Sequence, residues 1–149
     1  MRSSPGDPLA VFVDSCVWIG ALNRRDTHHD LYADALYRAK RGEWGEIVTS
    51  DYVLDEVVTR AMKSEKDVHL ARNLGEAILE SRAVNLLHVC EKDVREAWAI
   101  LIRYQDKRLS FTDCTIHRLL EREGIEHLLT SDSDFDGLGG DYETVNPLR

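Results

Sequence analysis

The fold is best understood by working outward from a stretch near the start of the chain, Leu9-Ala10-Val11-Phe12-Val13-Asp14-Ser15-Cys16-Val17-Trp18. Strand-forming apolar residues follow Pro8 and run to a single carboxylate, Asp14. A short apolar run of this kind is typical of a buried parallel strand. In an open α/β sheet, ligands bind outside the carboxyl ends of the strands, so Asp14 is expected to face a site. The alternative is that Asp14 only caps the turn or helix that follows.

Length and composition are those of a soluble globular protein. The 149 residues are 43% apolar and 31% charged, which is enough for one domain with a real core. No apolar run approaches the roughly 20 residues that span a bilayer, and residues 1–8 lack the apolar centre of a signal peptide. We therefore expect a flexible lead-in over residues 1–8, one domain over residues 9–149, and a cytoplasmic protein without a membrane segment. The three cysteines form no C-x-x-C pair, which fits reduced thiols.

The charge balance is acidic. There are 27 acidic and 19 basic residues, for a net charge of −8. This argues against nucleic-acid binding through a broad basic patch. It does not exclude a nuclease that holds metal ions, because clustered carboxylates raise the acidic count and bound cations offset it locally.

Strand and helix patterns alternate along the chain. We expect helices over about 26–41, 51–63, 68–81, 91–105 and 111–123, and strands over 46–49, 83–89, 125–129 and 142–145. Residues 19–26 are expected to form a loop. We interpret Trp18, Trp44, Trp98 and Tyr104 as residues that pack in the core or at its rim, not as stacking platforms. The alternation predicts a three-layer α/β/α sandwich around a mostly parallel sheet of about five strands.

Carboxylates recur where the active site of such a sheet would lie. Asp132 and Asp134 follow a predicted strand, as Asp14 does, and Asp113 lies in the first turn of a helix that can point toward the same edge. Crowded carboxylates repel one another unless they are protonated or hold a cation. Oxygen ligands without His or Cys favour Mg²⁺ or Mn²⁺.

Each of these carboxylates also has a structural interpretation. Ser110-x-x-Asp113 matches a capping box, and residues 131–136 match an Asx-rich turn. Glu56 and Asp55 lie at opposite margins of the apolar face of their helix, and periodicity alone does not choose between them. The agreement of several carboxylates at one sheet edge is what points to a site.

Four pieces of the chain resemble the PIN-domain ribonucleases, most closely the small toxins called VapC. They occur in the family's order within residues 9–147 and are Phe12-Val13-Asp14-Ser15, then Thr49-Ser50 with Glu56, then Leu109-Ser110-Phe111-Thr112-Asp113, then Leu129-Thr130-Ser131-Asp132-Ser133-Asp134-Phe135. The resemblance implies a five-stranded parallel sheet and a catalytic metal site. Its implied ligands are Asp14, Glu56, Asp113 and Asp132, with Asp134 either as an additional ligand or as a residue that supports the ligands from behind. It favours Glu56 over Asp55.

The resemblance also implies an activity. One or two Mg²⁺ or Mn²⁺ ions would assist hydrolysis of RNA phosphodiester bonds, and the chain would be the toxin of a type II toxin–antitoxin pair. An antitoxin protein and a second copy of the chain, docked through helices of the first half, are the implied partners. Ser15 and Thr112 match positions that line the site, and Arg24 and Arg25 are candidates for holding RNA phosphates.

Other functions remain open from the sequence. A housekeeping RNA-processing nuclease would carry the same site, and a catalytically silent module that binds metal or a protein partner would keep the acidic cluster. Phosphotransferases of the haloacid-dehalogenase type need a second Asp two residues after the first, where this chain has Cys16. A receiver domain needs a late Lys at a strand end, but Lys107 follows a helix.

Overall fold

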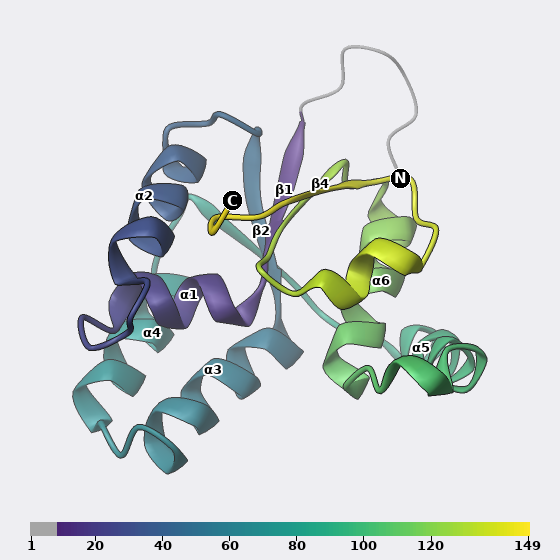
Figure 1. Ribbon diagram of the computed structural model, residues 1–149, viewed down its shortest axis with the longest axis horizontal. Helices are drawn as coiled ribbons and strands as arrows, with labels where there is room; N and C mark the ends of the chain where they lie inside the picture. The colour runs from purple at the N-terminus through teal and green to yellow at the C-terminus, as the bar shows by residue number, and fades with distance from the viewer. Residues whose placement is uncertain (1–8) are drawn as a thin grey trace.

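The computed structural model describes residues 9–149, so the lead-in predicted over residues 1–8 lies outside the described residues. The five strands are all parallel and lie in the order β3-β2-β1-β4-β5 (Figure 1). Their bounds are β1 Ala10–Val13, β2 Glu46–Ser50, β3 Val84–Leu87, β4 His127–Leu129 and β5 Glu143–Val145. The predicted parallel sheet of about five strands is confirmed.

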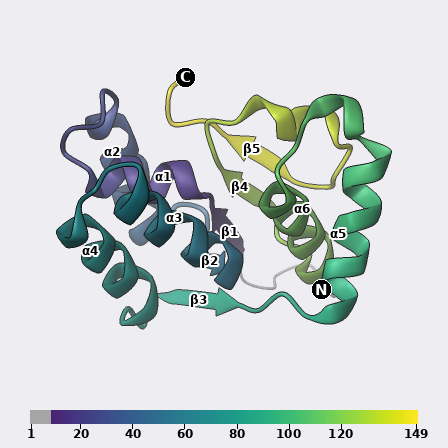
Figure 2. The same cartoon turned by 90° about the horizontal axis from the view of Figure 1, so that it is seen from below.

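Six α-helices cover the sheet in two groups. Their bounds are α1 Ser15–Leu22, α2 His29–Lys40, α3 Asp51–Lys63, α4 Val68–Leu79, α5 Glu91–Arg103 and α6 Phe111–Glu123. Two short 3₁₀ turns, η1 Gln105–Lys107 and η2 Ser133–Gly137, complete the set. Helices α1–α4 lie on one side of the sheet and α5 and α6 on the other (Figure 2), which is the predicted three-layer sandwich. None of the helices within residues 9–149 is long and apolar enough to cross a membrane.

The order of the strands reverses at β1. The chain proceeds outward from β1 to β2 and β3, then returns to place β4 on the other side of β1. Val13 at the end of β1 is in register with Leu129 at the end of β4, and the Asp14 N–H donates to the Leu129 carbonyl at 3.1 Å. Such a switch point is where open α/β sheets bind ligands. The residues that follow β1 and β4 are therefore brought together at this edge.

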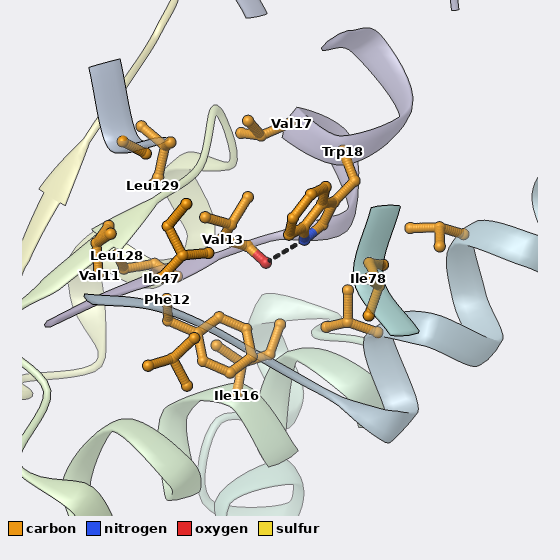
Figure 3. Packing of buried hydrophobic residues seen from close by; sticks show 14 of the residues in the cluster. Val11, Phe12, Val13, Val17, Trp18, Ile47, Ile78, Ile116, Leu128 and Leu129 are labelled. Atoms are coloured by element: carbon orange, nitrogen blue, oxygen red, sulfur yellow. Dashed lines mark hydrogen bonds between the residues drawn. The ribbon is translucent and has the colours of Figure 1, made fainter. Parts of the chain in front are cut away.

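The core explains why β1 is central. Val11, Phe12 and Val13 are all 0% exposed, because β1 has strands on both sides and helices on both faces (Figure 3). Trp18 is also fully buried, and its Nε1 donates to the Val13 carbonyl at 3.1 Å. Burying one large apolar side chain contributes about 1.5–3 kcal/mol. The apolar run quoted first is thus the centre of the fold.

The loop predicted over residues 19–26 is wrong in its first half. Helix α1 runs from Ser15 to Leu22 and is followed by Asn23, whose N–H donates to the Ile19 carbonyl. Val17, Ile19 and Gly20 are all buried, so the helix lacks the polar face that periodicity detects. Gly20 is required for packing, because a Cβ there would lie 2.1 Å from Cδ2 of the Tyr32 ring.

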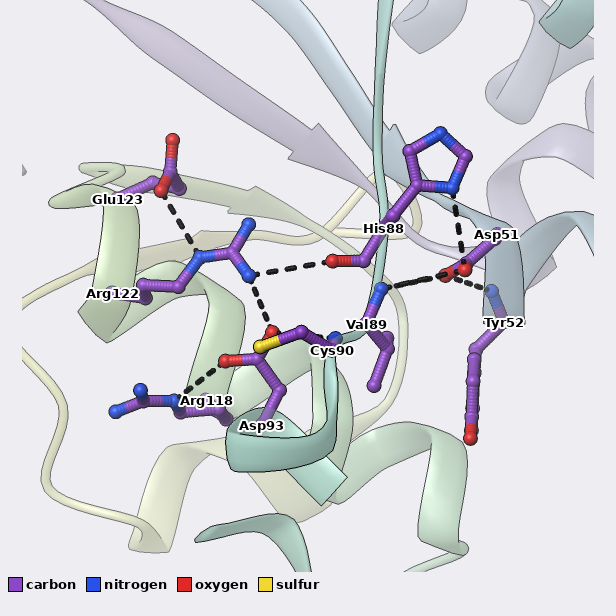
Figure 4. A network of polar contacts seen from close by, with 9 residues as sticks. All are labelled: Asp51, Tyr52, His88, Val89, Cys90, Asp93, Arg118, Arg122 and Glu123. Carbon is purple, nitrogen blue, oxygen red and sulfur yellow. Dashed lines mark hydrogen bonds and ion pairs between the residues drawn. The ribbon is translucent and has the colours of Figure 1, made fainter. Parts of the chain in front are cut away.

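A buried ion cluster joins α5 to α6. Asp93 is 0% exposed and lies in the first turn of α5, where its carboxylate accepts the Cys90 backbone N–H at 3.0 Å. It also accepts Arg118 Nε at 2.9 Å and a nitrogen of Arg122, both from α6 (Figure 4). Arg122 donates in turn to the His88 carbonyl at 3.3 Å, after β3. Burial raises the pKa of Asp93, but these hydrogen bonds and the Arg122 charge outweigh it, and the pKa falls to about 2.

The prediction of core or rim packing left two places open for Trp98, and its exposure excludes the core. Trp18 and Trp44 are buried as predicted, whereas Trp98 is 57% exposed. The neighbouring Ala97 is fully buried and faces α6. One position along a helix turns a side chain by about 100°, so Trp98 points outward from the edge of this interface.

Candidate active site

Asp14 is held at the carboxyl end of β1 by both of its oxygens. Its side chain caps α1, since Oδ1 accepts the Ser15 N–H at 2.7 Å. Oδ2 accepts the Thr130 hydroxyl at 2.8 Å. Burial, together with the charges of Glu56 and Asp132, raises the pKa of Asp14 to about 6 against the effect of these hydrogen bonds. Asp14 is therefore a buried carboxylate on which the charges of two other carboxylates, Glu56 and Asp132, act.

Asp113 forms the predicted capping box and also faces the other acids. Its N–H donates to Ser110 Oγ at 3.0 Å, and its Oδ2 accepts the Ser110 N–H at 3.1 Å. Burial raises the pKa of Asp113 to about 7, with further contributions from the charges of Asp14 and Asp132. The capping interpretation and the site interpretation thus apply to the same residue.

Asp132 follows β4 and caps η2. Its Oδ1 accepts the Asp134 N–H at 2.9 Å, so the predicted Asx-type turn is present. Burial raises the pKa of Asp132, and the Asp134 charge adds to the effect. Asp134 itself is exposed. Its position fits a supporting role for Asp132 better than a place among the buried acids.

Glu56 and Asp55 differ in exposure and in their contacts, although the helical periodicity of the sequence did not distinguish them. Glu56 is half-buried on α3, and its charge acts on Asp14. Asp55 is exposed, and its Oδ1 accepts the hydroxyl of Thr59 on the same helix at 3.4 Å. Of the two, only Glu56 is among the charges that raise the Asp14 pKa. This placement agrees with the choice that the family resemblance made.

The donor set suits a hard divalent cation. Asp14, Glu56, Asp113 and Asp132 supply only carboxylate oxygens, the ligands that Mg²⁺ and Mn²⁺ prefer. Burial, with the charges of neighbouring acids, raises the pKa values of Asp14 and Asp113, and a bound cation would relieve the repulsion between the carboxylates. Within residues 9–149, no three His, Cys, Asp or Glu side chains are already arranged to hold an ion.

The remaining predicted residues divide into two groups. Ser15 lies at the site, where its N–H and hydroxyl both donate to Asp14 Oδ1. Thr112 is half-buried directly before Asp113. Arg24 and Arg25 instead line a separate surface cavity of about 330 Å³ after α1, where Arg25 pairs with Asp67 at 3.2 Å. The structure thus brings Ser15 into contact with Asp14 and places Thr112 beside Asp113 in the chain, whereas the two arginines lie at another cavity.

Thr130 is a site residue that sequence reasoning missed. Its hydroxyl donates to Asp14 Oδ2 and accepts the Asp132 N–H at 3.0 Å, so it bridges two of the carboxylate residues. It is 1% exposed. The signal was present in the spacing Thr130-x-Asp132 after an apolar strand, because alternate residues at a strand end share one side.

Two hydrogen bonds from buried side chains hold the backbone of Val13, the residue directly before Asp14. The Val13 carbonyl accepts both Trp18 Nε1 and the Thr49 hydroxyl, each at 3.1 Å. Thr49 is fully buried at the end of β2. The strand end that carries Asp14 is therefore tied to α1 and to the neighbouring strand, which limits movement of the carboxylate.

Comparison with known proteins confirms the resemblance. The PIN domain profile matches residues 11–140. The chain is 30% identical over 129 residues to the 23S rRNA-specific endonuclease VapC20 of Mycobacterium tuberculosis, covering 87% of this chain and 94% of that protein. It is 27% identical over 139 residues to a VapC ribonuclease of Archaeoglobus fulgidus, covering 90% and 85%.

Solved structures agree with the fold. The crystal structure of Mycobacterium tuberculosis VapC20, described as a sarcin–ricin loop cleaving toxin, matches with a TM-score of 0.77 at 25% identity, covering 87% of this chain and 95% of that one. VapBC2 of Rickettsia felis, bound to promoter DNA, matches with a TM-score of 0.68 at 17% identity, covering 93% and 98%. The second match concerns the fold alone. The chain belongs to the PIN-domain family.

Proposed function

We propose that the chain is a metal-dependent endoribonuclease, and the toxin of a type II toxin–antitoxin pair. The observation that carries this proposal is the convergence of Asp14, Glu56, Asp113 and Asp132 at the switch point of a PIN-domain sheet. Relatives named as VapC endonuclease and ribonuclease support the activity. We also infer that residues 9–149 act as one PIN-like domain.

The four carboxylates would hold one or two Mg²⁺ or Mn²⁺ ions. A divalent cation bound there activates a water and stabilises the charge that develops on the scissile phosphate. Asp14 and Asp113 must be deprotonated to bind it, since a protonated carboxyl is a poor ligand. Thr130 and Ser15 hold the Asp14 carboxylate in place, and Asp134 holds Asp132 through its backbone N–H.

Cleavage of a panel of structured RNAs by the purified protein tests the activity. We expect cutting with Mg²⁺ or Mn²⁺ and none with EDTA. A wild-type protein that cuts no RNA in either metal would overturn the nuclease proposal and favour a module that only binds metal or a protein partner.

The proposed partners are an antitoxin and a second copy of the chain. Two structural neighbours, from Klebsiella pneumoniae and Salmonella typhimurium, are a toxin–antitoxin complex and a DNA-bound VapBC. We expect growth arrest on expression in a bacterial host, relieved by co-expression of the cognate small partner. A chain that causes no arrest but whose loss impairs maturation of one RNA would instead be a processing nuclease.

Removing the Thr130 hydroxyl is expected to weaken the site without unfolding the protein. Thr130→Val keeps the shape but leaves Asp14 Oδ2 and the Asp132 N–H without this partner. Loss of such an outer hydrogen bond costs about 10–100-fold in metal affinity or activity. The measurement is the metal dependence of RNA cleavage. Thr130→Ser, which retains the hydroxyl, should behave like the wild type, and equal rates for all three proteins would contradict the role.

The metal-free protein is expected to lose stability as pH rises from 4 to 8. Asp14 and Asp113 have folded pKa values of about 6 and 7, above the usual 3.8, so the folded state binds their protons more tightly. That contribution is complete below about pH 4 and is lost as pH rises through 6 to 7. At about 1.4 kcal/mol per pKa unit, the loss is at most about 7 kcal/mol, and solvent screening of the partly exposed Asp113 reduces it.

Urea unfolding at pH 5 and pH 8, with and without Mn²⁺, measures this effect. The metal should stabilise the protein more at pH 8, because its ligands are then already deprotonated. Asp113→Asn should flatten the pH dependence of the metal-free protein. A metal effect of equal size at both pH values would contradict the assignment of these two acids as ligands.

A further inference from the structure

The segment between α5 and α6 carries two cations that have no partner. Lys107 is the last residue of η1 and is half-buried, and Arg108 follows it and is exposed. Within residues 9–149, neither side chain forms a hydrogen bond or an ion pair. By contrast, Arg118 and Arg122 on α6 are held by the buried carboxylate of Asp93. Lys107 and Arg108 are therefore available to bind an anion from outside the chain.

Lys107 lies against the segment that follows β4. A Cβ at Gly137, the last residue of η2, would collide with Nζ and Cε of Lys107, so the ammonium group lies next to the Gly137 backbone. The Tyr104 hydroxyl donates to the Leu138 carbonyl at 3.3 Å and holds the two segments side by side (Figure 2). The turn η2 begins after the Asp132 cap, and its five residues span about 10 Å. The ammonium group of Lys107 is thus separated from a site acid by the length of one short turn.

Arg108 is placed by an unusual backbone conformation. Its φ is 56°, in the left-handed region that residues other than glycine, asparagine and aspartate rarely adopt. The chain then enters the cap of α6, where Ser110 and Asp113 are joined by two hydrogen bonds. Arg108 therefore stands two residues before the capping box that holds a site acid. Strained backbone of this kind gathers at functional sites.

The acidic surroundings of the site explain why such cations matter for an RNA strand. The chain has a net charge of −8, and other carboxylates act on both Asp14 and Asp113. A phosphodiester backbone is a polyanion that binds proteins chiefly through lysine and arginine. Arg24 and Arg25 line a separate cavity. The unpaired cations beside the acids are therefore placed to offset the repulsion that a strand entering the site would meet.

We propose that Lys107 and Arg108 form a phosphate subsite, which binds backbone phosphates of the RNA strand next to the scissile one. This inference rests on the proposed ribonuclease function and adds residues that hold the strand in the site. Lys107 would act as a point charge, whereas the guanidinium of Arg108 can bind a phosphate through two parallel N–H···O bonds. Such contacts position the strand but do not read its bases.

Anisotropy of a fluorescein-labelled RNA stem–loop, measured over a series of salt concentrations, tests the subsite. The whole chain is used with Mg²⁺ and with Asp14→Asn, so that the RNA stays uncut. Lys107→Gln and Arg108→Asn should each weaken binding about threefold or more, and the two together about tenfold or more. The slope of log affinity against log salt should become shallower by about 0.7–0.9 for each lost contact. Asparagine is chosen at position 108 because it tolerates the left-handed conformation.

Matched substitutions separate the charge from the structure. Lys107→Arg and Arg108→Lys keep the charge and should retain most of the wild-type salt slope. Lys40 is an exposed lysine in the last turn of α2, before the amino end of β2 and thus at the opposite edge of the sheet. Lys40→Gln should change neither the affinity nor the slope. Because Lys107 and Arg108 have no partners within residues 9–149, all these variants should keep the wild-type urea midpoint.

Cleavage kinetics distinguish a phosphate contact from a structural role of the segment. Loss of the subsite should raise KM for the RNA and leave kcat nearly unchanged, because the contacts lie away from the reacting atoms. If the variants instead lower kcat with KM and the salt slope unchanged, the segment only positions Asp113 and the subsite is wrong.

The experiment also separates the subsite from the nuclease function. If the wild type cuts RNA but the double variant binds with wild-type affinity and salt slope, the subsite fails and the nuclease function stands. If the wild type cuts no RNA but binds it with a salt slope that the double variant makes shallower, the nuclease function fails and the subsite stands. If no RNA is bound at any salt concentration, the subsite fails as well.

Discussion

Replacing Asp14 or Asp113 with asparagine is expected to reduce RNA cleavage by more than 100-fold. An amide keeps the size and most hydrogen bonds of the carboxylate but removes the charge that a cation needs. Changes to groups outside the ligand set cost about 10–100-fold, so loss of a ligand should exceed that range. The effect should appear in Mg²⁺ and in Mn²⁺, with single-turnover cleavage of the best RNA of the panel as the measurement.

Glu56 and Asp55 supply the matched control for this prediction. The two residues are adjacent on α3, but only Glu56 acts on Asp14. Glu56→Gln should therefore lose activity like the aspartate variants, while Asp55→Asn should cleave like the wild type. Urea midpoints should show that all four variants fold. Asp14→Asn and Asp113→Asn proteins that cleave at the wild-type rate would show that the acids are structural.

Asp93→Ala is expected to destabilise the protein by about 3–5 kcal/mol, which is the cost of removing one partner of a buried ion pair. The substitution leaves Arg118 and Arg122 partly buried without their shared carboxylate and removes the acceptor of the Cys90 N–H. It should also loosen the joint between α5 and α6. Urea unfolding monitored by circular dichroism measures the change in the free energy of unfolding.

An exposed pair provides the comparison. Arg72 and Glu76 form an i,i+4 ion pair at 3.1 Å with both side chains largely exposed, so Glu76→Ala should cost no more than about 0.5 kcal/mol.

The Asp93 cluster should also weaken at low pH. Its folded pKa of about 2 lies below the usual 3.8, so its contribution is complete above pH 4 and is lost as pH falls toward 2. If Asp93→Ala and Glu76→Ala lowered the free energy of unfolding by similar amounts, burial would not be what makes the Asp93 cluster important.

Two kinds of element could be predicted from the sequence: helices with one buried face, and strands that are buried on both faces. Residues 51–63 and 111–123 became helices with the predicted bounds, because each begins at a serine cap and has a regular apolar face. Helix α1 was missed because it is buried nearly all round and only eight residues long. Periodicity then carries no signal. The choice between core and rim for Trp98 stayed open in the sequence, because helical spacing locates a residue only to within one position of a face.

For the acids of the candidate site, the sequence left a choice between a capping role and a place in the site. The structure is compatible with both roles for the same residue. Asp14 and Asp132 each cap the element that follows, and Asp113 completes the capping box of its own helix. The charges of these acids also act on one another. A cap fixes a carboxylate in space, which is what a metal ligand needs. Thr130 escaped notice because its role depends on a contact with Asp14 across the sheet, between residues 116 positions apart.

The reversal of strand order at β1 has a consequence for biosynthesis. Asp14 and Glu56 belong to the half of the chain that is made first, whereas Asp113 and Asp132 belong to the half that is made last. While the nascent chain is still attached to the ribosome, β1 has β2 beside it but no β4, and only half of the acids are present. We therefore expect an unfinished chain to be unable to cut RNA, with this capacity arising only when the later acids and strands emerge from the exit tunnel.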